Sequence, residues 1–107
     1  MLTGKQRRHL RSLAHHLTVI VQIGKDGLSG SVIQATDEAL ARHELIKVKV
    51  GDGAGIDRHG RGDLAGALCE ATSAELAGSV GKTLILFRRN PEQSKIELPK
   101  DKPGKGK

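Results

Sequence analysis

The chain has 107 residues, enough for one domain with a single modest core. Its 18 lysine and arginine residues against 12 acidic residues give a net charge of +6, which favours a polyanionic partner, nucleic acid before an anionic membrane surface. One cysteine excludes an intrachain disulfide, and no apolar run reaches the roughly 18 residues of a membrane span. The N-terminus lacks a signal-peptide core, so we expect a cytoplasmic protein.

The charge is unevenly distributed along the chain. Residues 1–25 hold five basic and no acidic residues, residues 26–87 have a net charge of −3, and residues 88–107 one of +4. Phe87 is the only Phe, Tyr or Trp. RNA modules that stack successive bases on exposed rings are therefore excluded, and a nucleic acid would be held mainly by phosphate, sugar or shape.

Residues 3–16 are predicted to form a helix, because Thr3 and Gln6 have capping-box spacing. An apolar stripe follows at i, i+3, i+4 and i+7: Leu10, Leu13, Ala14 and Leu17. The side away from this stripe and its flanks carry Lys5, Arg7, Arg8, Arg11, Ser12 and His15. Such a side is often only solvated, but the absence of any acid favours an external anion, and we interpret it as a binding face.

A strand, a helix and a second strand come next. Residues 17–23 are short, β-branched and bounded by glycine, and residues 45–50 alternate apolar residues with Lys47 and Lys49. Between them, residues 29–43 read as a helix with Ser29 as its N-cap. This succession predicts a right-handed βαβ unit with parallel strands.

The sharpest local feature is the junction Gly24-Lys25-Asp26-Gly27 between the first strand and the second helix. Glycines permit positive φ and close approach of a ligand, and the next helix directs its free N–H groups to the same place. Lys25 adds a cation. The GxxG loop of KH domains holds phosphates in this way, although an ordinary strand-to-helix turn also needs glycines.

The second half is less regular. Residues 51–62 hold five glycines and predict a flexible loop, followed by a helix from about Asp63, its candidate cap, to Ala77. Its inward residues would be Leu64, Leu68, Ala71 and Leu76. We expect a short turn or strand and then a firm strand at 83–88, with 94–98 as a possible edge strand. Residues 1–99 would form the domain and 100–107 a disordered basic tail.

Other chemistry finds little support. Gly51, Gly53 and Gly55 do not complete a dinucleotide motif, and Gly81-Lys82-Thr83 lacks the upstream glycine of a P-loop. The five histidines and Cys69 have no metal-ligand spacing, and no catalytic constellation stands out. We therefore expect no enzyme activity, no cofactor and no metal.

Three segments in order carry a family resemblance: "GKDGLS" after a β-branched strand, "HELIKVKV", and "GKTLILFRR". Over residues 2–99 the chain resembles the CRM domain (chloroplast RNA splicing and ribosome maturation), most closely its stand-alone YhbY-like form. The resemblance implies a single compact α/β domain of order αβαβαββ with a mixed four-stranded sheet, similar to the C-terminal domain of translation initiation factor three. It also implies that Gly24, Lys25, Asp26 and Gly27 contact RNA.

The sequence departs from the family pattern in places. Asp26 puts an acid where a basic or neutral residue is expected, which weakens phosphate contact unless its side chain caps the next helix. Loop 51–62 is unusually glycine-rich, and Phe87 replaces a familiar tyrosine.

Taken together, these features predict a monomeric RNA-binding protein that grips precursor ribosomal RNA, or a pre-large-subunit particle, through the GxxG loop and the first helix. The alternative is an adaptor that docks on a ribosomal or assembly protein; a double-stranded DNA binder lacks a recognition-helix pattern.

Overall fold

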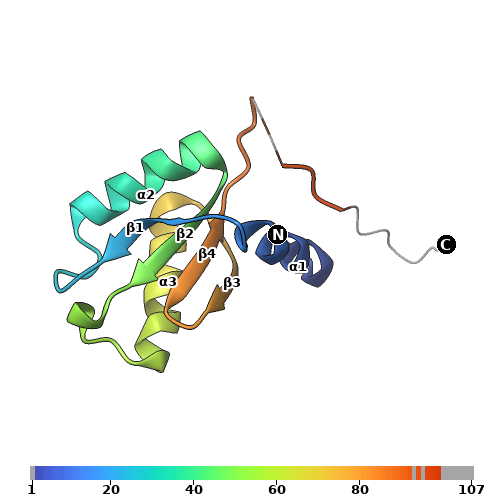
Figure 1. Ribbon diagram of the computed structural model, residues 1–107. Helices are drawn as coiled ribbons and strands as arrows, with labels where there is room; N and C mark the ends of the chain where they lie inside the picture. Colours follow the sequence, from blue (N-terminus) through green and yellow to red (C-terminus); the bar gives the residue numbers. More distant parts are fainter. Residues whose placement is uncertain (1, 93, 95, 100–107) are drawn as a thin grey trace.

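The computed structural model describes residues 2–92, 94 and 96–99, with the backbone alone at Arg58 (Figure 1). Within these residues the predicted order αβαβαββ is confirmed. The elements are α1 (Gly4–Ala14), β1 (Val19–Ile23), α2 (Gly30–His43), β2 (Leu45–Val50), a 3₁₀ turn (Asp52–Ala54), α3 (Arg58–Thr72), β3 (Glu75–Val80) and β4 (Thr83–Phe87). The domain boundary after residue 99 and the tail 100–107 lie outside the described residues.

The four strands form one mixed sheet in the order β1-β2-β4-β3, as expected. β1 and β2 are parallel, which the intervening α2 allows, and the pairs β2–β4 and β3–β4 are antiparallel. Because β1 and β2 are parallel, both end at the same edge of the sheet, with Ile23 opposite Val50. Whatever follows these two strands is therefore brought together.

Two predicted helix starts are confirmed in detail. The Thr3 side chain accepts a hydrogen bond from the Gln6 backbone N–H, and the Gln6 side chain accepts one from the Thr3 backbone, completing the capping box. The Ser29 hydroxyl accepts a hydrogen bond from the Val32 backbone N–H at 3.2 Å. These caps satisfy N–H groups that the first turn of a helix leaves free.

The prediction of a helix from Asp63 to Ala77 is wrong at both ends. α3 begins at Arg58, where the Asp57 carboxylate accepts a hydrogen bond from the Gly60 backbone N–H at 2.8 Å. It ends at Thr72, because Ser73 adopts a left-handed conformation with φ of 58°. Gly60, Gly62 and Gly66 have low helix propensity, so the sequence did not predict the first half of this helix. Packing of Ala65 and Leu68 on the sheet outweighs that low propensity.

Three further expectations change as a result. The loop at 51–62 is shorter, since only residues 51–57 precede α3. Ala71 is exposed, and Leu76 belongs to β3, where it pairs with Leu86. The described residues of 94–98 adopt no strand conformation.

The helices cover the two faces of the sheet unequally (Figure 1). α2 and α3 pack on one face, where Leu40, Leu68 and the buried side chains of β1, β2 and β4 form one cluster. α1 packs on the other face, most closely against β3, and its Leu10 and Ala14 form a second cluster with Ala77 of β3 and with Ile85 and Phe87 of β4. α1 also covers the start of β2, where Leu45 joins this cluster, but the part of the second face formed by β1 and the rest of β2 is left open, and it positions the site described next.

Candidate nucleic-acid interface

The GxxG segment forms a tight turn that joins β1 to α2. The Gly27 backbone N–H donates to the Gly24 carbonyl at 3.0 Å, and the Ser29 N–H donates to the Gly27 carbonyl at 2.9 Å. Gly27 has φ of 63°, a left-handed conformation that a residue without Cβ adopts at no steric cost. The turn leaves Lys25 and Asp26 exposed, next to the N-terminal end of α2.

A second glycine-rich turn lies beside the GxxG loop. The Gly51 backbone N–H donates to the Ile23 carbonyl at 2.8 Å, and a Cβ added at Gly53 would lie 3.9 Å from the Lys25 backbone nitrogen. In this turn the Asp52 carboxylate pairs with the Lys82 ammonium group. The loop end of the sheet thus holds acidic as well as basic groups. Asp26 does not cap α2, because Ser29 holds that position.

The second predicted group of site residues lies on α1. Lys5, Arg8, Arg11 and His15 are exposed, and Arg7 is half-buried. The expectation that Arg11 points away from the fold is wrong. Its Nη1 donates to the Ala77 carbonyl at 3.1 Å, and its aliphatic stem lies over Gly78, where an added Cβ would be 2.5 Å from the Arg11 Cδ. This arrangement fixes the Arg11 guanidinium group where α1 packs against β3.

The apolar stripe of α1 is only partly buried. Leu10 and Ala14 are completely buried, as expected, whereas Leu13 and Leu17 remain 37% and 38% exposed. Only two of the four residues in the predicted apolar stripe therefore lie in the core. Leu13 and Leu17 face the half of the sheet that α1 does not cover.

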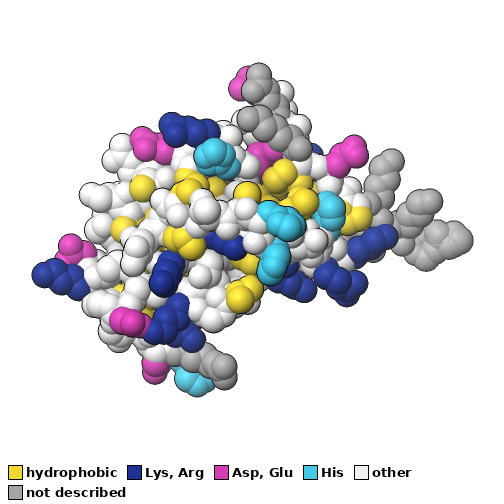
Figure 2. Space-filling model, viewed as in Figure 1, with side chains coloured by type: hydrophobic (Ala, Val, Ile, Leu, Met, Phe, Trp, Pro, Cys, Tyr) yellow, Lys and Arg dark blue, Asp and Glu magenta, His cyan; other side chains and the backbone are white. Residues whose placement is uncertain are grey.

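Lysines of β2 connect the two groups. Arg11, His15 and Lys47 line a groove of about 250 Å³ together with Val80, Thr83 and Ile85; we call it the basic groove. The Lys47 ammonium group donates to the Leu17 carbonyl at 3.0 Å, and Lys49 lies one pleat further along, on the same side of the strand. β2 then ends beside the GxxG loop. Figure 2 shows lysine and arginine side chains over α1, over the sheet and at the loop end.

The predicted site residues thus form two clusters at opposite ends of β2, about 20 Å of strand apart. The sequence missed that Lys47 and Lys49 lie between them. Their alternation with Ile46, Val48 and Val50 did place them on one side of the strand. Only the fold shows that this side faces α1.

Other candidate chemistry is weak among the described residues. No group of three or more His, Cys, Asp or Glu side chains is placed to hold a metal ion there. Cys69 lies half-buried in α3, and burial, with a smaller contribution from Glu75, raises the pKa of its thiol, which opposes thiolate formation. In the same part of the chain, no helix is both long and apolar enough to cross a membrane.

The fold and the surface together define a small basic α/β domain that presents cations, without exposed Phe, Tyr or Trp rings, along one half-open sheet face. Comparison with known proteins specifies the class. Residues 2–88 match the model of the CRS1 / YhbY (CRM) domain, and the chain belongs to this family.

Relatives are similar over nearly their whole length. The chain is 44% identical over 99 residues to the "Probable RNA-binding protein YqeI" of Bacillus subtilis, covering 92% of this chain and 100% of that protein. It is 40% identical to an "RNA-binding protein" of Haemophilus influenzae, covering 92% and 96%. The solution structure of the hypothetical protein SAV1595 from Staphylococcus aureus superposes with a TM-score of 0.80 at 43% identity, covering 92% and 100%. The likeness to translation initiation factor three stays a prediction.

Proposed function

We propose that this protein binds RNA, and that it does so through the half-open face of its sheet. The observation that carries the proposal is the placement of Arg11, His15 and Lys47 around one groove. Lys49 lies further along β2, between this groove and the GxxG loop. The names of the relatives in Bacillus subtilis and Haemophilus influenzae support RNA as the polyanion.

The grip we propose is mainly electrostatic. Cations that replace the counterions of a phosphate backbone gain affinity at low salt, whatever the base sequence. α1 supplies most of this charge, because it contains four lysine or arginine residues and no acid, and His15 follows as its C-cap. The GxxG loop would add Lys25 and the backbone N–H groups at the start of α2, which suit a phosphate oxygen.

We further propose that the RNA is precursor ribosomal RNA, bound during assembly of the large subunit, and that the protein acts in the cytoplasm as a monomer without catalysing a reaction. Family membership supports the first point, since the resemblance to the YhbY-like form implies it. Crosslinking to total cellular RNA followed by sequencing tests it directly: large-subunit precursor reads should be enriched over messenger and transfer RNA. An even spread over RNA classes contradicts it.

The GxxG contribution is tested with Lys25→Ala. Lys25 is exposed, so the substitution should leave folding unchanged. If Lys25 meets one phosphate of a single strand, the slope of log affinity against log salt should flatten by about 0.7. Arg42→Ala removes one exposed cation from α2 on the other side of the sheet and is the matched control. Equal slopes for both variants and the wild type would show that Lys25 does not touch phosphate.

The alternative, an adaptor that docks on a ribosomal or assembly protein, is distinguished by salt. Phosphate contacts weaken steeply as ionic strength rises, whereas an apolar protein contact does not. If binding to pre-large-subunit particles is insensitive to salt and survives nuclease treatment, the adaptor replaces the RNA-binding proposal.

A further inference from the structure

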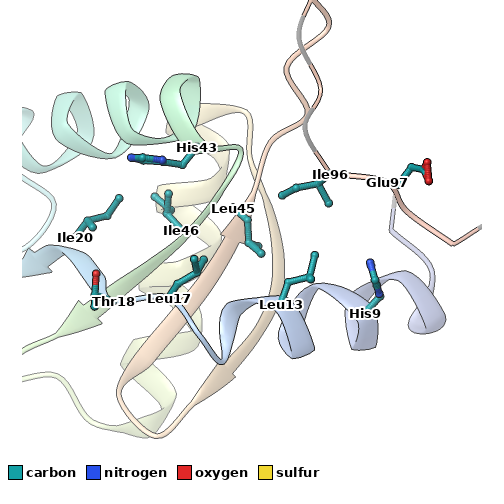
Figure 3. Close-up of a pocket in the computed structure, with 10 residues that line it drawn as sticks. All are labelled: His9, Leu13, Leu17, Thr18, Ile20, His43, Leu45, Ile46, Ile96 and Glu97. Carbon is teal, nitrogen blue, oxygen red and sulfur yellow. The ribbon is translucent and has the colours of Figure 1, made fainter.

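A second hollow, of about 560 Å³, lies next to the basic groove, where α1, the start of β1, the start of β2 and the last turn of α2 meet (Figure 3). We call it the seam hollow. Most of its lining is aliphatic: Leu13, Leu17, Ile20, Leu45, Ile46 and Ile96. Leu13, Leu17 and Ile20 are 37%, 38% and 47% exposed, an unusual concentration for so small a domain.

We propose that the seam hollow receives the base of one unpaired nucleotide while the adjoining phosphates lie on the basic groove. This inference rests on the proposed function and deepens it, since it makes the substrate single-stranded RNA or an unpaired nucleotide within a folded RNA. Bases in a duplex are stacked and paired on both sides and cannot enter a hollow of this kind without being extruded.

The two hollows share a wall, which is the first support. The end of α1 and the residues after it direct side chains alternately to the two sides: Arg11 and His15 line the basic groove, whereas Leu13 and Leu17 line the seam hollow. Lys47 holds the wall in place, because its ammonium group donates to the Leu17 carbonyl at 3.0 Å. The Lys47 cation and an apolar surface therefore lie on the two sides of Leu17. A bound nucleotide requires this arrangement, because its charged phosphate and its base need different surroundings a short distance apart.

The second support is the chemistry of the lining. Phe87 is buried to 3% exposure, so a base finds no Phe, Tyr or Trp ring on this protein. Aliphatic side chains can still cover the face of a base, and the imidazole rings of His9 and His43, at two sides of the seam hollow, can stack on it. Glu97 is the acidic residue of the lining; it suits an amino group on a base edge and repels phosphate, which leaves phosphate to the basic groove.

Other occupants fit less well. Residues 100–107, "KDKPGKGK", contain no Leu, Ile, Val, Met or aromatic side chain that would fill an apolar hollow. An apolar segment of a protein partner would bury the same leucines, but it has no use for the cations on the shared wall. The charge beside the hollow therefore favours a nucleotide.

The test uses the full chain and a short single-stranded oligoribonucleotide that carries one fluorescent adenine analogue, alongside a duplex of the same sequence. Wild-type protein should bind the single strand at least tenfold more tightly than the duplex and change the fluorescence of the analogue. Leu17→Gln should weaken binding of the single strand by about tenfold, because it removes one apolar contact of the base. The salt slope should stay unchanged, because no phosphate contact is lost.

Leu76→Gln is the matched control. Leu76 is 37% exposed, close to the value for Leu17. It lies on β3 directly opposite Leu86, and both side chains therefore point to the face beneath α2 and α3, away from the seam hollow. This variant should bind RNA like the wild type. Ile20→Gln, on the other side of the seam hollow and more exposed, should reproduce the effect of Leu17→Gln if one base fills the space.

The outcomes separate the two proposals. If Leu17→Gln and Ile20→Gln bind the single strand as tightly as the wild type, the base-binding inference is overturned while the proposed RNA binding stands. Equal affinity for the single strand and the duplex overturns the inference in the same way. If the wild type binds neither RNA, the proposed function fails. If only binding to a protein of the pre-large-subunit particle is lost in the two variants, the occupant of the hollow is protein.

Discussion

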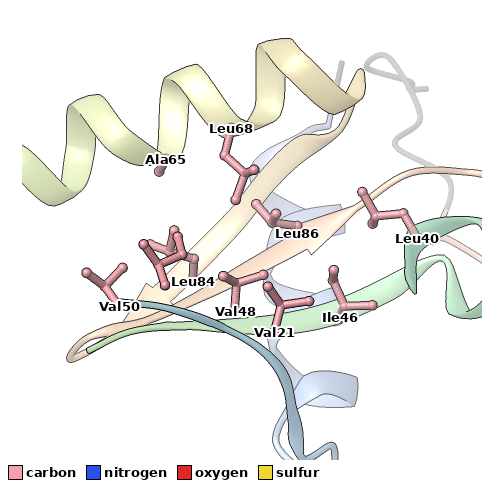
Figure 4. Close-up of a cluster of buried hydrophobic side chains, with 10 residues drawn as sticks. Val21, Leu40, Ile46, Val48, Val50, Ala65, Leu68, Leu84 and Leu86 are labelled. Carbon is pink, nitrogen blue, oxygen red and sulfur yellow. The ribbon is translucent and has the colours of Figure 1, made fainter. Parts of the chain in front are cut away.

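The two faces of the sheet differ in how completely they are covered. On the face beneath α2 and α3, side chains from β1, α2, β2, α3 and β4 form one buried cluster, including Val21, Val48, Leu68 and Leu86 (Figure 4). On the other face α1 covers β3, β4 and the start of β2 but not β1, and Leu13, Leu17 and Ile20 stay partly in contact with water. The closed face holds the larger of the two buried clusters, and the half-open face carries both hollows and the cations between them.

The difference shows how one short amphipathic helix serves two purposes. Leu10 and Ala14 anchor α1 to the sheet, whereas Arg11 and Leu13, which lie between them in the sequence, line the two hollows. A helix placed centrally over the sheet would have buried Lys47 and the two leucines. Its offset position leaves a surface that is apolar and basic at once.

The largest expected effect is on stability and separates the two faces directly. Leu68→Ala should lower the free energy of unfolding by about 2–5 kcal/mol, because a completely buried side chain leaves a cavity. Leu13→Ala should cost less than about 1 kcal/mol, since the side chain is 37% exposed. Urea denaturation measures both, and RNA titration should show the reverse order, with only Leu13→Ala weakening binding. Equal losses of stability would contradict the distinction between the faces.

The next effect is on RNA affinity. Arg8→Gln combined with Arg11→Gln should weaken RNA binding about tenfold, or roughly 1.4 kcal/mol. The pair should also lose a little stability, at most about 1 kcal/mol, because Arg11 no longer donates to the Ala77 carbonyl. An RNA titration and a thermal melt on the same variant measure both.

Arg42→Gln with Arg61→Gln removes the same charge from α2 and α3 and is the matched control. If both double variants lose the same affinity, net charge alone governs binding and α1 has no special role.

The closed face was largely predictable from the sequence, for a physical reason. Buried strands read as β-branched runs, and the cap at Ser29 is a local signal, so β1, α2, β2 and β4 were placed within a few residues. α3 and β3 were not, because Gly60, Gly62 and Gly78 weaken local propensity there and only packing on the sheet decides the structure.

The candidate site was predictable in its parts but not in its assembly. Helical periodicity placed Arg8 on an exposed face, the glycine spacing placed Lys25 in an exposed loop, and strand alternation placed Lys47 and Lys49 on one side of a strand. It could not show that α1 sits off-centre, which exposes Leu13 and Leu17 and turns Arg11 toward β3. Those are consequences of contacts between residues far apart in the chain, and no local pattern encodes them.

A smaller effect on RNA affinity is expected at Gly78, because the Arg11 side chain of α1 lies directly over this residue of β3. In Gly78→Ala the new Cβ would meet the aliphatic stem of Arg11, so the stem must move and the bond to the Ala77 carbonyl is strained or lost. RNA affinity should fall about threefold, or roughly 0.6 kcal/mol, with the fold retained. Gly66→Ala, in α3 with open space around it, should slightly raise stability and leave RNA binding unchanged. Wild-type affinity in Gly78→Ala would show that the seated position of Arg11 does not matter.

The smallest expected effect is a gain at the loop end of the half-open face. There the Asp52 carboxylate pairs with Lys82 beside the GxxG loop, and both side chains are well exposed, at 85% and 49%. Breaking so exposed a pair costs little stability. Asp52→Asn removes one acid near Lys25 and frees the Lys82 ammonium group for phosphate, so RNA affinity at low salt should rise about twofold and the salt slope should steepen. Asp63→Asn, an exposed acid on α3, is the control for net charge alone and should change affinity less. If Asp52→Asn weakens binding instead, the ion pair holds the glycine-rich turn in its binding conformation. The acidic residue would then support RNA binding at the loop end rather than repel the phosphates.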